Sequence, residues 1–304
     1  MKNEKDIPHG FKQLAIEDKE VFDRYLHTDP PVISELTFTN LFIWRQCHNP
    51  VWMEREDCLL IALREKSGPM FGLPPTGLGD KTRALDFLAE QLRLADPNAR
   101  ISRVPEIFVE QFVDYGKYEV LPDRNNSDYV YRSDDLINLP GRKYHRKKNH
   151  LNKFLKTYTH EYHTLDEELL KYFLDMQEQW CQLKDCKTHP DLLEEDYAVY
   201  QALTHLRELD YQGGAIIIDG RVEAFALGEP LNENTAVIHI EKANQEISGI
   251  YAAINQLFCL HAWAGMEYIN REQDLGIEGL RKAKESYAPH HLVNKYTLVP
   301  KGIK

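Results

Sequence analysis

Apolar residues in the second half of the chain alternate between helical and strand spacing. Phe173, Met176 and Trp180 recur every three or four positions, which predicts a helix. Thr164, followed three residues later by Glu167, matches a capping box at the start of this helix. Helical spacing also predicts helices over 191–209, 247–264 and 280–286. Strand-like apolar runs predict strands over 236–241 and 267–269.

A hairpin and a final strand complete this half. Residues 215–218 and 222–227 have strand-like composition, and Asp219-Gly220 between them is typical of a two-residue hairpin turn. A last strand is expected over 295–299. The predicted order is therefore two helices, a hairpin, a strand, a helix, a strand, a helix and a strand.

The first half gives a similar order. Its pattern predicts helices over 18–26, 35–45, 81–94 and 106–112, a hairpin over 51–64, and strands over 70–73, 101–104, 118–121 and 129–132. No close sequence identity links the halves, so the repeat is one of element order alone. A turn-rich stretch at 138–141 predicts the boundary, which gives domains 1–138 and 139–304.

Composition narrows the class of protein. Hydrophobic residues make up 42% and charged residues 28% of the chain, which is typical of a globular protein. The net charge of −11 argues against DNA binding and against broad adhesion to anionic membranes. Cys181, Cys186 and His189 lack the second cluster that a zinc site needs, so no metal is expected. The chain has no apolar leader and no run approaching about 20 apolar residues, so we expect a cytoplasmic protein without an integral membrane segment.

A basic helix is expected just after the domain boundary. Arg142, Lys143, Arg146, Lys147 and Lys148 crowd into two turns of an otherwise acidic chain. A solvated amphipathic helix is one interpretation. The other is that something negative neutralises these cations, because like charges at helical spacing repel one another. An acidic first domain, a nucleotide phosphate or a tRNA backbone could supply this negative charge.

The stretch 270–289 combines a glycine turn with a second basic helix. Asp274, Leu275 and Gly276 form the expected loop, and Arg281 and Lys284 lie on the helix that follows. Backbone N–H groups and cations gathered in this way are how proteins hold an anionic ligand. The alternative is a solvated helix preceded by a plain turn.

Three stretches of the chain resemble a known family. They are SELTFTNLFIWR (34–45), YHRKKNHLNKFLK (144–156) and NREQDLGIEGLRKAKESYAP (270–289). They resemble an uncharacterised bacterial family related to the C-terminal catalytic domain of lysyl-phosphatidylglycerol synthases and, more distantly, to Fem-type aminoacyltransferases. The resemblance implies an α/β fold of two tandem domains similar to N-acetyltransferases (GNAT-like), each a mixed sheet flanked by helices.

The resemblance also implies a reaction. It predicts transfer of an acyl group, with aminoacyl-tRNA as the expected donor, to an amine or hydroxyl acceptor, and no cofactor is required. A non-catalytic GNAT-like module that binds a nucleotide, tRNA or protein partner is the first alternative. An acyl-coenzyme A-dependent N-acetyltransferase is the second. The acceptor and the oligomeric state stay open.

The resemblance places the active cleft in the second domain. Glu241 ends the third strand, where a carboxylate can deprotonate or position an amine, and Tyr287 follows the last helix, where GNAT enzymes often keep a general acid. An exposed strand-end charge and a packed aromatic are the plainer interpretations of these two residues. The residues expected to bind ligand are Tyr144, Lys147, Lys148, Asn149, Asn270, Arg271, Asp274, Arg281 and Lys284.

The loop over 242–251 corresponds to the GNAT loop that cradles the pyrophosphate of coenzyme A. Ser248 and Gly249 are its candidate cofactor-binding residues, although Ser248 is also suited to cap the next helix. The loop has one glycine, and Glu246 stands where a basic residue would help. A carboxylate near a pyrophosphate costs about 1 kcal/mol or more when partly desolvated. We therefore expect that acetyl-coenzyme A is not the natural donor.

Overall fold

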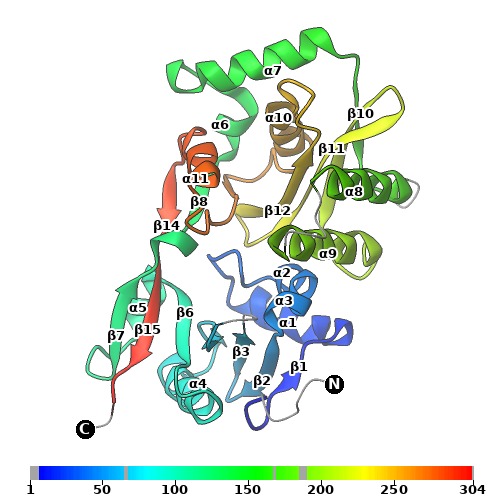
Figure 1. Ribbon diagram of the computed structural model, residues 1–304. Coiled ribbons are helices and arrows are strands. Elements are labelled where there is room, and N and C mark those ends of the chain that lie inside the picture. Colours follow the sequence, from blue (N-terminus) through cyan, green and yellow to red (C-terminus); the bar gives the residue numbers. More distant parts are fainter. Residues whose placement is uncertain (1–6, 65–67, 167–168, 185–189, 303–304) are drawn as a thin grey trace. The chain divides into compact units, whose positions relative to one another are not determined.

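The computed structural model describes residues 7–64, 68–166, 169–184 and 190–302. The chain divides into two compact units, the first made of Met1–Asp128 and Val293–Lys304 and the second of Tyr129–Leu292. Each unit is built around one mixed β-sheet with helices against its faces (Figure 1). The predicted α/β class, with two mixed sheets flanked by helices, is confirmed.

The sheet of the first unit has the strand order β1-β2-β3-β4-β6-β15-β7, with β5 beside β3. Its strands are β1 (Lys12–Gln13), β2 (Val51–Arg55), β3 (Cys58–Arg64), β4 (Met70–Gly72), β5 (Thr76–Gly77), β6 (Arg100–Pro105), β7 (Tyr118–Pro122) and β15 (Lys295–Pro300). Its α-helices are α1 (Lys19–Thr28), α2 (Phe38–Ile43), α3 (Arg45–His48), α4 (Lys81–Ala95) and α5 (Glu106–Phe112). Leu85, Leu88 and Leu92 of α4 join Ile101 and Leu298 of the sheet in one buried core.

The sheet of the second unit has the order β14-β8-β13-β12-β11-β10-β9. Its strands are β8 (Asp128–Arg132), β9 (Glu161–Thr164), β10 (Gln212–Ile218), β11 (Arg221–Pro230), β12 (Thr235–Ala243), β13 (Tyr268–Asn270) and β14 (His291–Val293). Its α-helices are α6 (Ser133–Asn138), α7 (His145–Thr157), α8 (Leu170–Lys184), α9 (Pro190–Thr204), α10 (Ile250–Ala262) and α11 (Glu278–Glu285).

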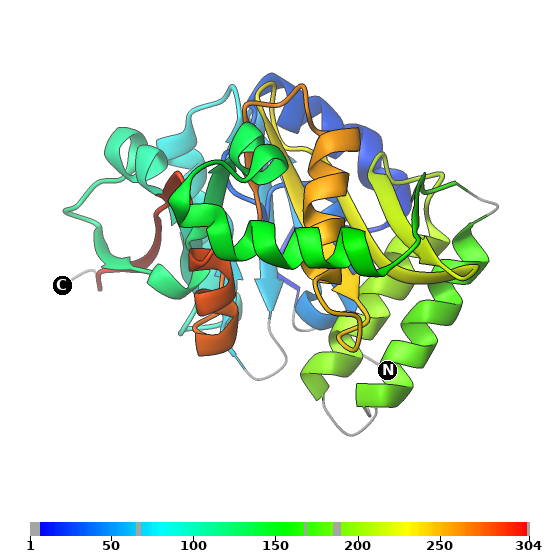
Figure 2. The ribbon, with the colours of Figure 1, turned by 90° about the horizontal axis from the view of Figure 1, so that it is seen from above.

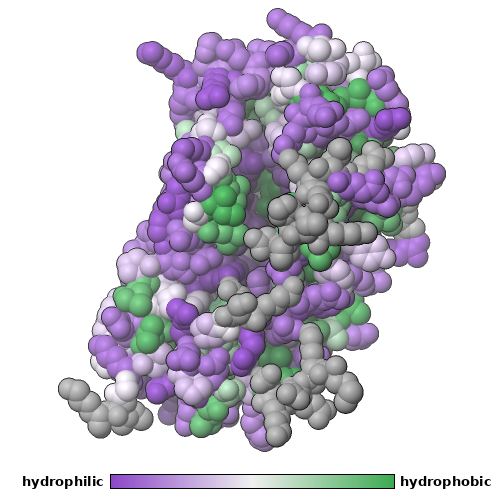
Figure 3. Space-filling model, in the orientation of Figure 1, coloured by the Kyte–Doolittle hydropathy of each residue, from purple (hydrophilic) through white to green (hydrophobic). Residues whose placement is uncertain are grey.

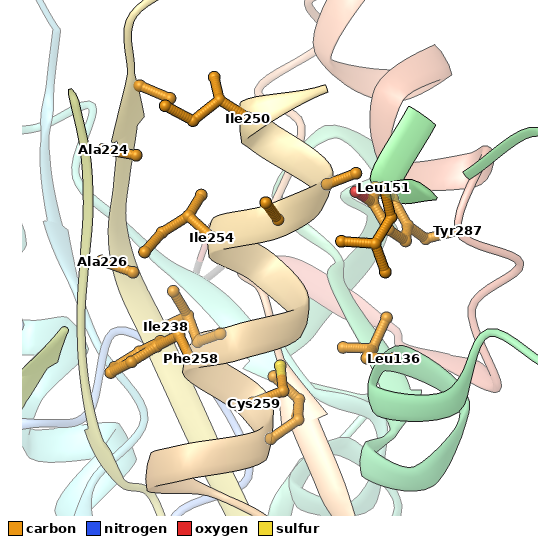
Figure 4. Close-up of a cluster of buried hydrophobic side chains, with 14 of the residues drawn as sticks. Leu136, Leu151, Ala224, Ala226, Ile238, Ile250, Ile254, Phe258, Cys259 and Tyr287 are labelled. Atoms are coloured by element: carbon orange, nitrogen blue, oxygen red, sulfur yellow. The ribbon is translucent and has the colours of Figure 1, made fainter. Parts of the chain in front are cut away.

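Helix α10 is the centre of the second unit. Ile254 and Phe258 pack on Ala224 and Ala226 of β11 and on Ile238 of β12 (Figure 4). The small alanines let the apolar helix lie close to the sheet, and this burial supplies the hydrophobic stabilisation of the unit. Helix α7 crosses over α10 (Figure 2). Helix α10 therefore lies between α7 and the sheet.

Both predicted hairpins are present. β2 pairs with β3 from Val51↔Ala62 to Arg55↔Cys58, and β10 pairs with β11 down to Ile218↔Arg221. The second hairpin turns at Asp219 and Gly220, which both have positive φ angles of 49° and 75°. That is the backbone of the two-residue turn that Asp-Gly favours.

One predicted cap is wrong. Thr164 ends strand β9, where it pairs with Gly214 of β10, and so it does not start a helix. Instead, the side chain of Asp166 accepts a hydrogen bond of 2.9 Å from the Leu169 N–H just before α8. Glu167, the predicted partner of Thr164, lies outside the described residues, as do Cys186 and His189.

Two strands differ from their expected sheets. β8 was expected to close the first sheet, but it lies between β13 and β14 in the second. β15 was expected in the second domain, but it pairs with β6 and β7 in the first. The compact units therefore differ from the predicted ranges 1–138 and 139–304, because the chain enters the second sheet at β8 and returns to the first at β15.

Candidate active site

The end of the pairing between two parallel strands forms the framework of the candidate site. β12 and β13 pair only from Thr235↔Tyr268 to Val237↔Asn270, after which β13 ends and β12 continues. Glu241 lies on the part of β12 that continues beyond the end of β13. Arg271, directly after β13, reaches it with Nη2 at 3.0 and 3.2 Å from the two carboxylate oxygens. The pair is 14% and 13% exposed, so it bridges the two diverging strands in a largely dry environment.

A β-bulge decides which way Glu241 points. The register of β11 with β12 passes from Leu227↔Ile240 to Gly228↔Ile238, which leaves His239 as the extra residue. An extra residue reverses the alternation of side chains along the strand. Ile238 and Glu241 therefore both lie on the α10 side, where strict alternation would place only one of them.

Helix α10 supplies a polar residue to the Glu241–Arg271 pair. Asn255 is 1% exposed, and its Nδ2 donates a hydrogen bond of 3.2 Å to Glu241 Oε2. Two buried atoms beside the pair, Asn255 Oδ1 and Arg271 Nη1, have no hydrogen-bond partner among the described residues. A buried polar atom without a partner costs free energy, so these two atoms are candidates for contact with a bound group. Asn255 was missed from the sequence, although an asparagine within an otherwise apolar helix was a usable signal.

Aromatic rings and a lysine complete the cluster. The Arg271 guanidinium lies 4.8 Å from the ring centre of Tyr287, and Lys147 Nζ lies 3.9 Å from the same ring. Burial, reinforced by the charge of Arg271 and opposed by that of Glu241, lowers the pKa of Lys147 to about 8. Burial raises the pKa of Tyr287, so its phenol is neutral at physiological pH. The structure thus brings Glu241, Arg271, Tyr287 and Lys147 together.

The other predicted ligand residues of 270–289 make a supporting layer. Asp274 is fully buried and is held by Arg281 at 2.8 and 2.9 Å and by the Tyr129 hydroxyl at 2.7 Å. Burial alone would raise the pKa of Asp274, but these hydrogen bonds lower it below its usual value. Lys284 donates a hydrogen bond to the Arg271 carbonyl, which anchors α11 to the loop after β13. Arg281 therefore orders the loop through Asp274.

Four further predicted residues differ in their surroundings. Asn270 is buried, and its Oδ1 accepts the Glu272 N–H at 2.8 Å, which shapes the turn that carries Arg271. Tyr144 is also buried, and its hydroxyl donates to Asp135 at 3.2 Å. Lys148 and Asn149 are exposed on α7.

Several backbone N–H groups of the loop before α10 are hydrogen-bonded within the loop itself. The Glu246 N–H bonds to Asn244 Oδ1, and the N–H groups of Ile247 and Ile250 bond to carbonyls within the loop. A Cβ added to Gly249 would lie 2.3 Å from the His150 carbonyl of α7. The glycine is thus explained by the close approach of α7. Ser248 makes no side-chain cap hydrogen bond to α10.

The cations of α7 lie at the surface. In the space-filling view of Figure 3, much of the region where Figure 1 places α7 is hydrophilic. Lys143 forms an ion pair with Asp135 at 3.1 Å. The described residues provide no ion-pair partner for the exposed α7 cations Arg146, Lys148, Lys153 and Lys156, nor for Arg142 in the turn just before α7. This helix therefore keeps a stripe of unneutralised positive charge.

His239 is a second residue that the sequence did not single out. Its ring is 1% exposed and donates to Glu229 and Glu272, each at 2.8 Å. Burial opposes its charge, but the two carboxylates outweigh burial and raise the pKa of His239 to about 10. The alternation of Ile238, His239 and Ile240 in the sequence predicts only that His239 points away from the face of the two isoleucines. The bulge and the two carboxylates become visible only in the fold.

This imidazolium predicts a pH dependence of stability. The pKa of His239 is raised above its unfolded value near 6.5, so its stabilisation is complete below about pH 6.5 and is lost as the pH rises toward 10. Urea unfolding should show that His239→Gln costs most free energy at about pH 6 and progressively less at higher pH, by at most about 1.4 kcal/mol per pH unit. The exposed His163→Gln is the matched control. A cost of His239→Gln that does not change with pH would contradict the charged state.

The described residues contain neither a membrane-spanning helix nor a metal-binding cluster. No described helix is long and apolar enough to span a bilayer. Those residues also contain no group of three or more His, Cys, Asp or Glu side chains arranged to hold a metal ion.

Comparisons with known proteins place the chain among proteins of similar fold. A conserved protein of unknown function from Bacteroides thetaiotaomicron is 31% identical, with a TM-score of 0.88 over 97% of this chain and 100% of that chain. L-PGS from Bacillus licheniformis is 16% identical, with a TM-score of 0.64 over 94% and 93%. FemX is 10% identical, with a TM-score of 0.56 over 94% and 96%. The fold expected from the resemblance is confirmed by these structures.

Sequence comparison gives the same assignment. An uncharacterised protein of Mycoplasmoides gallisepticum is 24% identical over 190 residues, a match that takes in 59% of this chain and 58% of that relative's own length. The family model described as "Phosphatidylglycerol lysyltransferase, C-terminal" matches residues 30–299. Since this match covers most of the sequence, the chain belongs to the phosphatidylglycerol lysyltransferase C-terminal family.

Proposed function

We propose that the second unit transfers an aminoacyl group from an aminoacyl-tRNA to an amine or hydroxyl acceptor. Family membership supports an acyltransferase of the aminoacyltransferase-like class. The observation that carries the finer proposal is the Glu241–Arg271 pair, with Asn255 Oδ1 as an unpartnered acceptor and Arg271 Nη1 as an unpartnered donor.

An aminoacyl ester matches these atoms. Its α-ammonium group donates hydrogen bonds and its carbonyl oxygen accepts them. Glu241 and Asn255 Oδ1 would receive the ammonium group, and Arg271 Nη1 would donate to the carbonyl oxygen. An acyl group without the ammonium would leave the Asn255 acceptor unpaired in a buried place. The site therefore favours an aminoacyl over a simple acyl donor.

The reaction follows from the same side chains. The acceptor's lone pair forms a bond to the acyl carbon, and the ester C–O bond to the tRNA breaks. Arg271 stabilises the oxyanion of the tetrahedral intermediate. Lys147, whose pKa of about 8 leaves part of it uncharged at neutral pH, takes the acceptor's proton. Tyr287 gives a proton to the leaving oxygen, and Lys147 then returns one to Tyr287.

Helix α7 supports a polyanionic donor. Its exposed cations have no ion-pair partners among the described residues, while its Lys147 belongs to the candidate site. A nucleic-acid backbone that binds such a stripe releases condensed counterions, which supplies salt-dependent affinity. One helix thus carries a surface suited to tRNA and a side chain of the site itself.

The loop before α10 argues against acetyl-coenzyme A as the donor. Its N–H groups at residues 246, 247 and 250 are already bonded, Glu246 is negative, and α7 abuts Gly249. Isothermal titration should therefore give no acetyl-coenzyme A binding stronger than millimolar, which is about 4 kcal/mol. Glu246→Gly should raise the affinity for acetyl-coenzyme A only slightly, because removing a carboxylate frees no N–H donor. Sub-micromolar binding by the unaltered protein would turn the assignment toward an ordinary acetyltransferase.

The proposal is tested by following the acyl group. The protein is mixed with tRNA charged with radiolabelled amino acids, together with phosphatidylglycerol vesicles, small amines or peptides as separate acceptors. We expect label to move to one acceptor class with the unaltered protein, and not with Glu241→Gln at equal folded concentration. If the label stays on tRNA with all acceptors while the tRNA remains bound, the non-catalytic alternative is the better account.

A further inference from the structure

The first unit carries a hollow that the proposed transfer reaction does not use. It has a volume of about 380 Å³ and is lined only by residues of that unit, from β4, β6, β7, β15 and the segment after β7. We call it the unit 1 groove and define it by Phe71, Arg100, Ser102, Arg103, Leu121 and Thr297. A second hollow of about 610 Å³ shares Arg100 and Pro69 with it, so Arg100 lies where the two hollows meet.

A β-bulge aims two neighbouring side chains into this groove. The register of β6 with β15 passes from Val104↔Tyr296 to Ile101↔Leu298, so Ser102 and Arg103 lie together opposite Thr297. Arg103 has a φ of 60°, a conformation that is uncommon for residues other than glycine. Bulges of this kind re-aim side chains beside functional sites. Here the bulge lets consecutive residues line one hollow, which a regular strand forbids.

Contacts with Glu35 and Phe71 hold the Arg103 guanidinium in place. Its Nη1 lies 3.4 Å from Glu35 Oε1, and its guanidinium is 5.1 Å from the ring centre of Phe71. Glu35 also binds the fully buried Lys295 at 2.6 Å, and Lys295 binds Asp128 at 2.6 Å. Each buried charge in this set has an opposite neighbour, which is the condition for keeping charges out of water. Arg103 is therefore a fixed cation at the inner wall of the groove.

Arg100 provides the second cation. It is exposed, and it forms no ion pair or hydrogen bond with any described side chain, which distinguishes it from Arg103. Asp123 is the one carboxylate among the residues that line the groove, and both of its oxygens accept hydrogen bonds from Asn126 Nδ2, at 2.9 and 3.0 Å. Leu121 is 40% exposed and adds apolar surface, and Phe71, which is 6% exposed, lines the groove beside it.

We propose that the unit 1 groove binds a small organic anion, a carboxylate or phosphate that carries an apolar group. Arg100 and Arg103 would hold the anionic group, since planar guanidinium groups match both carboxylate and phosphate geometry. Ser102 and Thr297 supply neutral hydrogen-bonding groups beside them, and Phe71 and Leu121 receive the apolar part. The volume suits a ligand of a few functional groups. This site is independent of the transfer reaction proposed for the second unit.

The test uses phenyl phosphate and benzoate as the two anionic probes and benzyl alcohol as the neutral one. Isothermal titration of the full chain at constant ionic strength should detect at least one anionic probe and give no heat with benzyl alcohol. Arg100→Gln should weaken binding of that probe at least tenfold, and Leu121→Glu should do the same by placing a negative charge on the wall. Arg93→Gln, on an exposed face of α4, removes the same charge elsewhere and should leave the affinity unchanged.

Several outcomes would contradict anion binding in the unit 1 groove. Benzyl alcohol binding as tightly as the anions would make the groove a plain apolar hollow. Equal affinities in Arg100→Gln and the unaltered protein would remove the proposed cation, and equal losses in Arg93→Gln would indicate unspecific charge attraction. Failure of all anionic probes would also reject it. Because no tRNA is present, each of these results is separate from the outcome of the transfer assay.

Discussion

Replacing Arg271 with methionine should abolish aminoacyl transfer and lower the free energy of unfolding by about 3–5 kcal/mol. The substitution leaves the Glu241 carboxylate 13% exposed with Asn255 as its remaining side-chain hydrogen-bond partner among the described residues. It also removes the donor that we propose for the carbonyl oxygen of the aminoacyl ester. Urea unfolding and single-turnover transfer, measured on the same preparation, give the two quantities.

A double-mutant cycle isolates the pair. Glu241→Gln combined with Arg271→Met should cost less than the sum of the single changes, because the two residues lose one shared interaction. Arg132→Met is the matched control, since its pair with Glu267 is 3.5 Å long and about half exposed, and it should cost below about 1 kcal/mol. Additive costs in the cycle would show that Glu241 and Arg271 do not stabilise each other.

Reversing two charges on α7 should weaken tRNA binding at least tenfold at low salt. Arg146→Glu with Lys148→Glu changes exposed side chains, so folding should be preserved. Each lost phosphate contact should also reduce the slope of log affinity against log salt by about 1. Filter binding across a salt series measures both effects.

The control for α7 makes the same charge change elsewhere. Arg83→Glu with Arg93→Glu alters two exposed cations of α4 in the first unit. That variant should bind tRNA nearly as well as the unaltered protein, because it keeps α7 intact. If both variants lose affinity and salt slope equally, α7 is an ordinary solvated face and the net charge alone governs binding.

Most elements of the fold could be predicted because spacing reports which residues are buried together. The helix expected over 106–112 is α5 (Glu106–Phe112), and the Asp219-Gly220 turn lies between β10 and β11. The sheets to which β8 and β15 belong could not be predicted. A strand's pattern specifies its buried and exposed faces but contains no information about its neighbour at long range.

The candidate site was predictable only in part. Glu241 and Tyr287 were expected from their places in the fold that the resemblance implied, and the structure brings both to Arg271. The bulge at His239 could not be foreseen, because it depends on register with β11 rather than on local sequence. Without it, Glu241 would be expected on the face away from Asn255. Hence the polar partners of Glu241 become clear only from the structure.

The Glu241–Arg271 site is proposed to recognise the aminoacyl group of a charged tRNA. The most direct measurement compares the affinity of the protein for aminoacylated and deacylated forms of the same tRNA pool. We predict at least tenfold tighter binding of the charged form, and loss of this difference in Glu241→Gln while the salt dependence contributed by α7 is retained. Equal affinities for charged and deacylated tRNA in the unaltered protein would contradict the account.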